Sequence, residues 1–180
     1  MITIHGEISE IQNGFNEIVN HLSAFKLQKD IKINVKKSDK DVFVKCDKSE
    51  AVIEYNKPIN FFRALGQMIC ALSGNDSFVI EEREVFETMG CSPEINLNKF
   101  SMAGHKAWFR YMAVLGLDTY LMSIPCAYKV EGYPYFGYMS GAYTPEEIKE
   151  TVAYAQLFGI EVIPCVQFLS HLGRFLQWYA

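Results

Sequence analysis

The sequence lacks the features of several functional classes. Lys and Arg number 17 against 21 Asp and Glu, and the net charge of -4 argues against a nucleic-acid partner. No run of about 18 apolar residues is present, so we expect no membrane span and no membrane partner. The first residues lack a basic segment followed by an apolar core, so they are not expected to act as a signal peptide.

Cysteines are few and form no disulfide or metal-binding pattern. The five cysteines include no Cys-x-x-Cys pair, and an odd number without a secretion signal favours free thiols in a reducing cytoplasm. Cys126 and Cys165 can approach on adjacent strands, but no histidine or third cysteine lies at a useful spacing for zinc. Because a phosphate-binding loop and a Ser/His/Asp set are also missing, we expect no cofactor.

The sequence does have ample apolar residues for a folded core. Hydrophobic residues make up 49% and aromatic residues 14% of the 180 residues. This length suits one domain or two small ones. The residue pattern changes near residue 88, which favours two domains, 1–88 and 89–180.

Residues 1–88 have the pattern of a small α+β domain. Apolar residues at helical spacing predict an amphipathic helix over about 14–26. A second helix is predicted to begin at Pro58 and to end at residues 73–75, with Arg63 solvated or in a local ion pair. Alternating apolar and polar residues predict half-buried strands in a meander. These predicted strands are 2–4, 31–35, 42–44 and 51–55.

Residues 89–180 change to an alternation of helices and strands. A helix is predicted over 106–115, with His105 and Lys106 at the surface. The strand predicted over 117–122 is mostly apolar, which is consistent with burial on both faces. The apolar residues on one face of the helix are Trp108, Tyr111, Met112 and Leu115.

A further helix and strand complete a right-handed βαβ unit. Thr144 and Glu147 form a capping box at the start of a helix over 145–158, and an apolar strand follows at 160–166. Such a unit implies a parallel sheet or barrel. Two or three units do not close an eight-stranded barrel, and an open apolar edge invites association. We therefore expect either a small open sheet or, as we favour, the front part of a longer chain. A stand-alone chain is expected to form a homo-oligomer that covers the sheet edge.

Polar and aromatic residues gather where these strands end. A loop over 133–144 is rich in tyrosine and glycine, and Gln167 and His171 follow the last strand. In parallel α/β proteins, ligands bind at the carboxyl ends of the strands. Tyr135 and Tyr138 can either stack on a ligand or pack the loop onto the core. His171 can likewise contact a ligand or bond to its own loop backbone.

Several motifs resemble glycoside hydrolase family 20, the β-N-acetylhexosaminidases, and most closely the bacterial intracellular type. The resemblance covers most of the chain from about residue 50, with the motifs in the family's order. The motifs are residues 60–66 (Asn-Phe-Phe-Arg-Ala-Leu-Gly), 133–139 (Tyr-Pro-Tyr-Phe-Gly-Tyr-Met), 143–144, 159–161, 163–165 and 167–172.

The resemblance implies an α/β fold and a glycosidase chemistry. The fold would be a small N-terminal α+β domain followed by the first two or three βα units of an incomplete TIM barrel. Family members remove terminal β-linked N-acetylglucosamine or N-acetylgalactosamine, and the acetamide of the substrate acts as the nucleophile. An adjacent Asp-Glu pair supports this step in the family. This sequence contains no Asp-Glu dipeptide, so we expect it to be inactive alone.

The resemblance also implies contacts with an N-acetylhexosamine-containing glycan. The residues that would make them are Gln167, His171, Tyr135 and Tyr138. The family usually has an arginine after its first barrel strand and a tyrosine with an acidic pair after its second. This sequence has neither, and residues 123–126 read Ser-Ile-Pro-Cys.

Three hypotheses follow from these patterns. The chain is the N-terminal part of a family 20 hexosaminidase, or a non-catalytic relative that binds carbohydrate or a protein partner. The third hypothesis, a complete small enzyme of another class, finds no catalytic set in the sequence.

Overall fold

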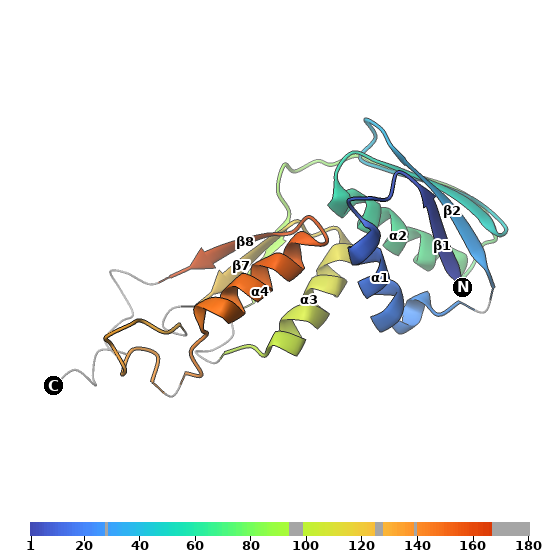
Figure 1. The fold of residues 1–180 in the computed structure, drawn as a ribbon. Helices are drawn as coiled ribbons and strands as arrows, with labels where there is room; N and C mark the ends of the chain where they lie inside the picture. Colours follow the sequence, from blue (N-terminus) through green and yellow to red (C-terminus); the bar gives the residue numbers. More distant parts are fainter. Residues whose placement is uncertain (28, 94–98, 125–127, 139, 167–180) are drawn as a thin grey trace.

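The computed structural model describes residues 1–180 except 28, 94–98, 125–127, 139 and 167–180. The described residues form a mixed α/β fold with a five-stranded and a three-stranded sheet (Figure 1). The elements are β1 (Ile2–Gly6), α1 (Gln12–His21), a 3₁₀ turn (Ser23–Phe25), β2 (Ile31–Lys37), β3 (Val42–Asp47), β4 (Glu50–Tyr55), α2 (Pro58–Leu72), β5 (Ser77–Glu82), β6 (Gly90–Cys91), α3 (Met102–Leu115), β7 (Thr119–Ser123), α4 (Pro145–Gln156) and β8 (Glu161–Cys165).

The five-stranded sheet has the order β1-β2-β4-β3-β5. The predicted strands are confirmed, but the predicted meander is wrong, because β2 pairs with β4 in parallel and not with β3. Strands β3 and β4 form a tight hairpin at Lys48, whose φ is 55°. The alternation of residues predicts strands but not which strands are neighbours, and β5 carried no prediction at all.

Helices α1 and α2 pack on one face of this sheet (Figure 1). Helix α2 begins at Pro58, as predicted, because proline lacks the N–H that a first helical residue leaves unpaired. Helix α1 ends at His21, earlier than predicted, and a 3₁₀ turn then buries Phe25. Arg63 forms an ion pair with Glu82, with 3.1 Å between Nε and Oε2, which confirms the prediction for Arg63.

The second sheet is parallel, with the order β6-β7-β8, and α3 and α4 lie on one of its faces (Figure 1). The predicted capping box of α4 is confirmed: Glu147 N–H donates to Thr144 Oγ1 at 3.2 Å, and Thr144 N–H donates to Glu147 Oε2 at 2.8 Å. On the face opposite the helices, Ile163 is 38% exposed. Within the described residues, β6 and β8 have no further strand beyond them.

The buried face of α3 differs from the sequence prediction. His105, predicted at the surface, is only 1% exposed and faces the core with Phe109. Trp108 and Tyr111 are 38% and 57% exposed. The helix carries two apolar stripes, and the sheet packs against the one that contains His105. Spacing alone does not distinguish the two stripes.

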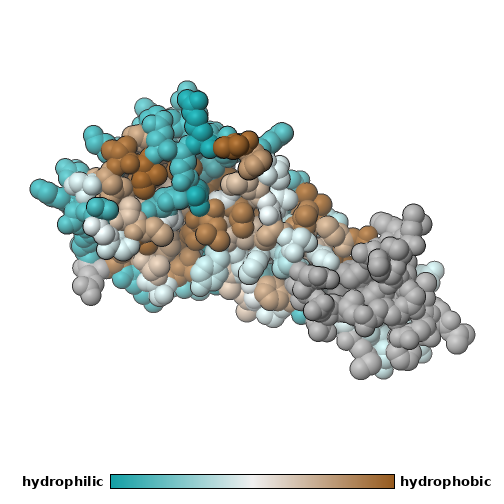
Figure 2. Space-filling model, turned by 180° about the vertical axis from the view of Figure 1, so that it is seen from behind, coloured by the Kyte–Doolittle hydropathy of each residue, from teal (hydrophilic) through white to brown (hydrophobic). Residues whose placement is uncertain are grey.

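One continuous apolar core joins the two sheets. The rings of Phe62 on α2 and Phe158 after α4 pack edge to face at a centroid distance of 5.2 Å. Gly66 on α2 lies against the backbone of Val114 on α3, and Gly14 on α1 lies against the backbone of Leu157. Figure 2 shows the molecule from behind, and hydrophilic residues are concentrated over the end that holds the five-stranded sheet.

Polar side chains also connect the helices that lie between the two sheets. The Tyr154 hydroxyl on α4 donates to the carboxylate of Glu17 on α1. Arg110 on α3 donates to the Tyr154 hydroxyl at 2.7 Å, and its guanidinium lies 3.6 Å from the Glu17 carboxylate. Three helices therefore meet at one charged cluster, which helps to fix the two sheets relative to each other.

Candidate functional site

The carboxyl ends of β7 and β8 lie side by side. Ser123 and Cys165 are partners in the register, and Ile124 N–H donates to the Cys165 carbonyl at 3.0 Å just beyond them. The chain from Ile124 to Thr144 leaves β7 at this end and leads into α4 (Figure 1). Parallel sheets bind ligands where such loops emerge, so we place the candidate site in this loop.

The base of the loop is held by several bonds. Tyr128 and Tyr143 form a parallel β-bridge, and Lys129 N–H donates to the Tyr143 carbonyl at 2.9 Å. Lys99 N–H donates to the Ser140 carbonyl at 3.0 Å, and the Lys99 ammonium pairs with the carboxylate of Glu147. This ion pair lowers the pKa of Glu147 through the hydrogen bond from Lys99. The loop is therefore tied to both α4 and the segment before α3.

Tyr143 anchors the loop to the core. Its hydroxyl accepts from Phe100 N–H at 2.6 Å and donates to the Phe100 carbonyl at 3.0 Å. The same hydroxyl lies 2.9 Å from His105 Nε2, and His105 Nδ1 lies 3.4 Å from the Tyr120 hydroxyl. Since Tyr143 already donates to Phe100, the proton between Tyr143 and His105 belongs on Nε2, and Nδ1 accepts from Tyr120.

This histidine is neutral and serves the structure. Burial lowers the pKa of His105 to about 4, so the ring carries no charge at neutral pH. Burial also raises the pKa values of Tyr120 and Tyr143, whose hydroxyls stay protonated. His105 shares a helical face with Phe109 and Met112, which are both buried.

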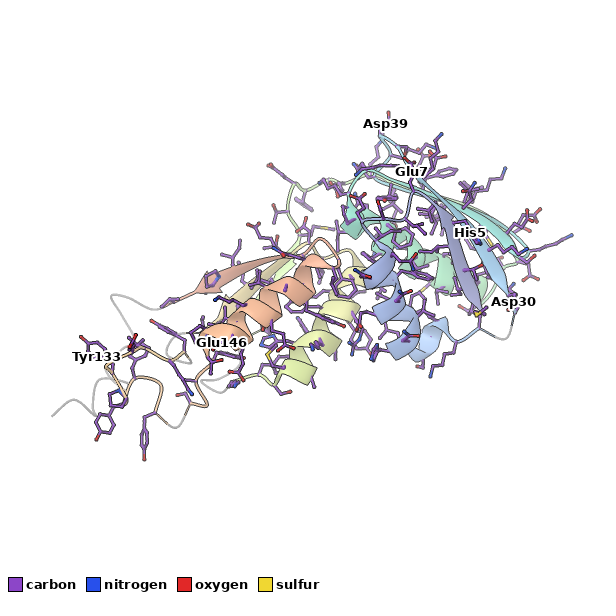
Figure 3. The ribbon with its side chains drawn as sticks, viewed as in Figure 1. His5, Glu7, Asp30, Asp39, Tyr133 and Glu146 are labelled. Carbon is purple, nitrogen blue, oxygen red and sulfur yellow. The ribbon has the colours of Figure 1, made fainter. Side chains whose placement is uncertain are left out.

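The predicted ligand-facing residues fall into two groups. Tyr135 and Tyr138 are 53% and 52% exposed, and their rings pack edge to face with centroids 6.2 Å apart. Tyr133, 56% exposed, lies at the end of the molecule away from the five-stranded sheet (Figure 3). Gln167 and His171 lie outside the described residues, so their roles stay predictions.

A hollow of about 410 Å³ lies on the five-stranded sheet, on the face opposite α1 and α2. Lys32 and Lys45 line it together with Asp47 and Glu50, and His5 lies on the same face (Figure 3). Because both signs of charge are mixed there, the hollow favours neither an anion nor a cation. We therefore keep the candidate site at the loop that follows β7.

Metal-ligand clusters and membrane-spanning helices are both absent from the described part of the chain. No three His, Cys, Asp or Glu side chains in it come together as a metal site. Cys165 is a free thiol there, whereas Cys126 lies outside the described residues. None of the helices in the same ranges is long and apolar enough to cross a bilayer.

The fold is similar to solved β-N-acetylhexosaminidase structures. The Bacteroides fragilis β-N-acetylhexosaminidase matches 99% of this chain with a TM-score of 0.71 at 14% identity. The Flavobacterium johnsoniae chitobiase matches 99% with a TM-score of 0.67 at 17% identity. A Vibrio harveyi family 20 β-N-acetylglucosaminidase, solved with N-acetylglucosamine, matches 91% with a TM-score of 0.68 at 15% identity. The predicted resemblance to family 20 is thus confirmed at the level of the fold.

This chain spans only part of those structures. It covers 42% of the Bacteroides enzyme and 32% of the Flavobacterium and Vibrio enzymes. At the level of sequence, no family model and no curated protein matches the chain.

Proposed function

We propose that this chain is the opening part of a family 20 β-N-acetylhexosaminidase. Residues 1–88 would be its N-terminal α+β domain, and residues 89–180 the first βα units of its TIM barrel. The observation that carries this proposal is the fold match over 91% to 99% of the chain. The parallel order of β6, β7 and β8 supports it, because parallel sheets are normally covered on both faces and, within the described residues, the helices cover one.

The chemistry of the whole enzyme would be exo-hydrolysis of β-linked N-acetylhexosamine. The substrate's acetamide oxygen attacks the anomeric carbon, a carboxylate orients the acetamide, and a glutamic acid protonates the leaving group. This chain would supply Gln167 and His171 as contacts with the sugar, together with the loop after β7. The Asp-Glu pair is missing from its sequence, so the proton donor must come from elsewhere.

The 180-residue chain is expected to release no chromogenic aglycone from a β-N-acetylglucosaminide. The reason is that its sequence holds no Asp-Glu pair to orient the acetamide and protonate the leaving group. The measurement is a p-nitrophenol assay with a complete family 20 enzyme as the positive control. Hydrolysis well above background that stays with the purified chain would overturn this part of the proposal.

A non-catalytic binding module is the second candidate. It is favoured by the apolar stripe of α3, where Trp108, Tyr111 and Leu115 are 38%, 57% and 56% exposed. A protein partner or a second copy of the chain would cover this stripe. Free thiols at Cys46, Cys70, Cys91 and Cys165 suit the reducing cytoplasm, where we place either form of the protein.

A further inference from the structure

The chain that connects the two sheets presents apolar side chains at the surface. Val85 is 85% exposed, Phe86 68% and Met89 39%. Residues 85–87 form a bend after β5, and we call residues 85–88 the linker bend. Single exposed apolar residues need no explanation, but three within five residues indicate a surface that another molecule covers.

The linker bend is held at both ends. Glu84 N–H donates to Asp41 Oδ2 at 2.9 Å, and the Glu84 carboxylate pairs with the Lys57 ammonium at 2.7 Å. At the other end, Met89 N–H donates to the Asp118 carboxylate at 2.9 Å, and Asp118 N–H donates to the Met89 carbonyl at 2.8 Å. The bend therefore presents its side chains from fixed ends, which lowers the entropy lost when a partner binds.

An acidic hollow lies beside the start of the linker bend. Its volume is about 360 Å³, and Asp41, which holds Glu84, is one of its lining residues. Asp39, also in the lining, lies at the end of the five-stranded sheet from which the linker leaves (Figure 3). Four acidic and two basic side chains line the hollow, so its formal charge is -2: Asp39, Asp41, Glu81 and Glu82 against Lys40 and Arg83.

Part of this negative charge is open to a partner. The Lys40 ammonium is engaged elsewhere, at 3.8 Å from the Glu54 carboxylate and 3.5 Å from the ring centroid of Phe43. Within the described residues, neither Asp39 nor Glu81 forms an ion pair. The hollow repels phosphates and anionic membranes, whereas the lysine or arginine side chains of a partner would meet open carboxylates.

We propose that the linker bend and the acidic hollow together bind a protein segment that carries lysine or arginine beside large apolar residues. The apolar side chains pack on the linker bend, and the basic side chains enter the hollow next to Asp39 and Glu81. The two features adjoin, because only Glu84 separates Arg83 of the hollow from Val85 of the bend. This inference does not depend on the proposed hydrolase function.

The test is an NMR titration of the 180-residue chain with three acetylated and amidated pentapeptides: Lys-Leu-Lys-Leu-Lys, Lys-Ser-Lys-Ser-Lys and Glu-Leu-Glu-Leu-Glu. The first peptide is expected to bind at least about fivefold more tightly than the other two, because it alone offers both basic and apolar side chains. Phe86→Ser should weaken its binding about five- to tenfold, and Glu81→Gln about two- to fivefold.

Tyr133→Ser and Glu146→Gln are the matched controls, because both residues lie away from the five-stranded sheet (Figure 3) and Tyr133 is 56% exposed. Both variants should bind the lysine–leucine peptide within about twofold of the original protein. Circular dichroism checks the fold: Phe86→Ser should melt within about 2 °C of the original protein, because the side chain it replaces is exposed.

Three results of the titration would overturn the proposal: no binding of the lysine–leucine peptide, equal binding of the three peptides, or equal losses in Phe86→Ser and Tyr133→Ser. Sedimentation adds a fourth. A chain that sediments as a dimer, and as a monomer after Phe86→Ser, would show that a second copy covers the linker bend, and the proposal would then be wrong. None of these results bears on the fold match or on the hydrolysis assay.

Discussion

Replacing Gly66 with alanine is expected to lower the free energy of unfolding by about 2–3 kcal/mol. A Cβ at this position would lie closer than 3.0 Å to the backbone carbonyl of Val114, a distance that Cβ atoms essentially never show. No change of rotamer relieves a clash with backbone, so α2 and α3 must move apart along their contact. The better helix propensity of alanine recovers at most about 1 kcal/mol, and the net effect stays destabilising.

Thermal unfolding followed by circular dichroism measures this effect. A loss of this size lowers the melting temperature by about 5–10 °C in a chain of this length. Gly74→Ala is the control, because a Cβ there meets nothing within 4 Å and the residue follows the same helix. Equal melting temperatures for the two variants would mean that α2 and α3 do not pack as closely as described. The described packing between the two sheets would then be wrong.

Tyr143→Phe is expected to destabilise the protein by about 2–3 kcal/mol, although it removes a single oxygen atom. The missing hydroxyl leaves Phe100 N–H, the Phe100 carbonyl and His105 Nε2 without their bonds. The neutral His105 ring is buried at 1% exposure, so water does not readily replace the lost partner. Urea denaturation of the variant and of the original protein gives the difference directly.

Tyr120→Phe serves as the comparison, because Tyr120 is also fully buried and, within the described residues, its hydroxyl makes one contact, at 3.4 Å to His105 Nδ1. It should cost about 1 kcal/mol or less. A loss for Tyr120→Phe as large as that for Tyr143→Phe would show that the hydroxyl of Tyr143 is not the anchor of the loop. Faster proteolysis between residues 128 and 144 in Tyr143→Phe alone would add to the case for the anchor.

The sequence predicted local structure correctly where that structure depends on residues close together in the chain. Pro58 and the Thr144–Glu147 capping box marked helix ends that the structure confirms. Each of these signals depends on backbone groups within about one helical turn. The alternation of residues 31–35 likewise predicted a strand with one buried face.

The sequence patterns did not predict which strands are neighbours or which face of a helix packs against the sheet. The position of β4 beside β2 is set by how the β3–β4 hairpin docks, and the residues of β2 are equally compatible with β3 as a neighbour. His105 was expected at the surface because it lies beside Lys106 at the start of the helix, whereas it lies on the face of α3 that packs against the sheet. Only the packing of α3 against β7 shows that its partners are the hydroxyls of Tyr143 and Tyr120.

The candidate site was predicted in part. The loop over 133–144 was singled out from its tyrosines and glycines, and the structure places Tyr135 and Tyr138 at the surface with their rings in contact. The turns that present these rings, and the inward position of Phe136, depend on backbone hydrogen bonds that residue types do not specify. Whether the rings of Tyr135 and Tyr138 bind sugar stays a prediction.

Sequencing the gene downstream of the codon for Ala180 tests most directly whether this chain opens a family 20 barrel. The proposal predicts an open reading frame with roughly five further βα units, which complete an eight-stranded barrel, and an adjacent Asp-Glu pair. A stop codon directly after Ala180 would contradict it. The second candidate, a binding module, would then be favoured, and its partner would be sought at the apolar stripe of α3.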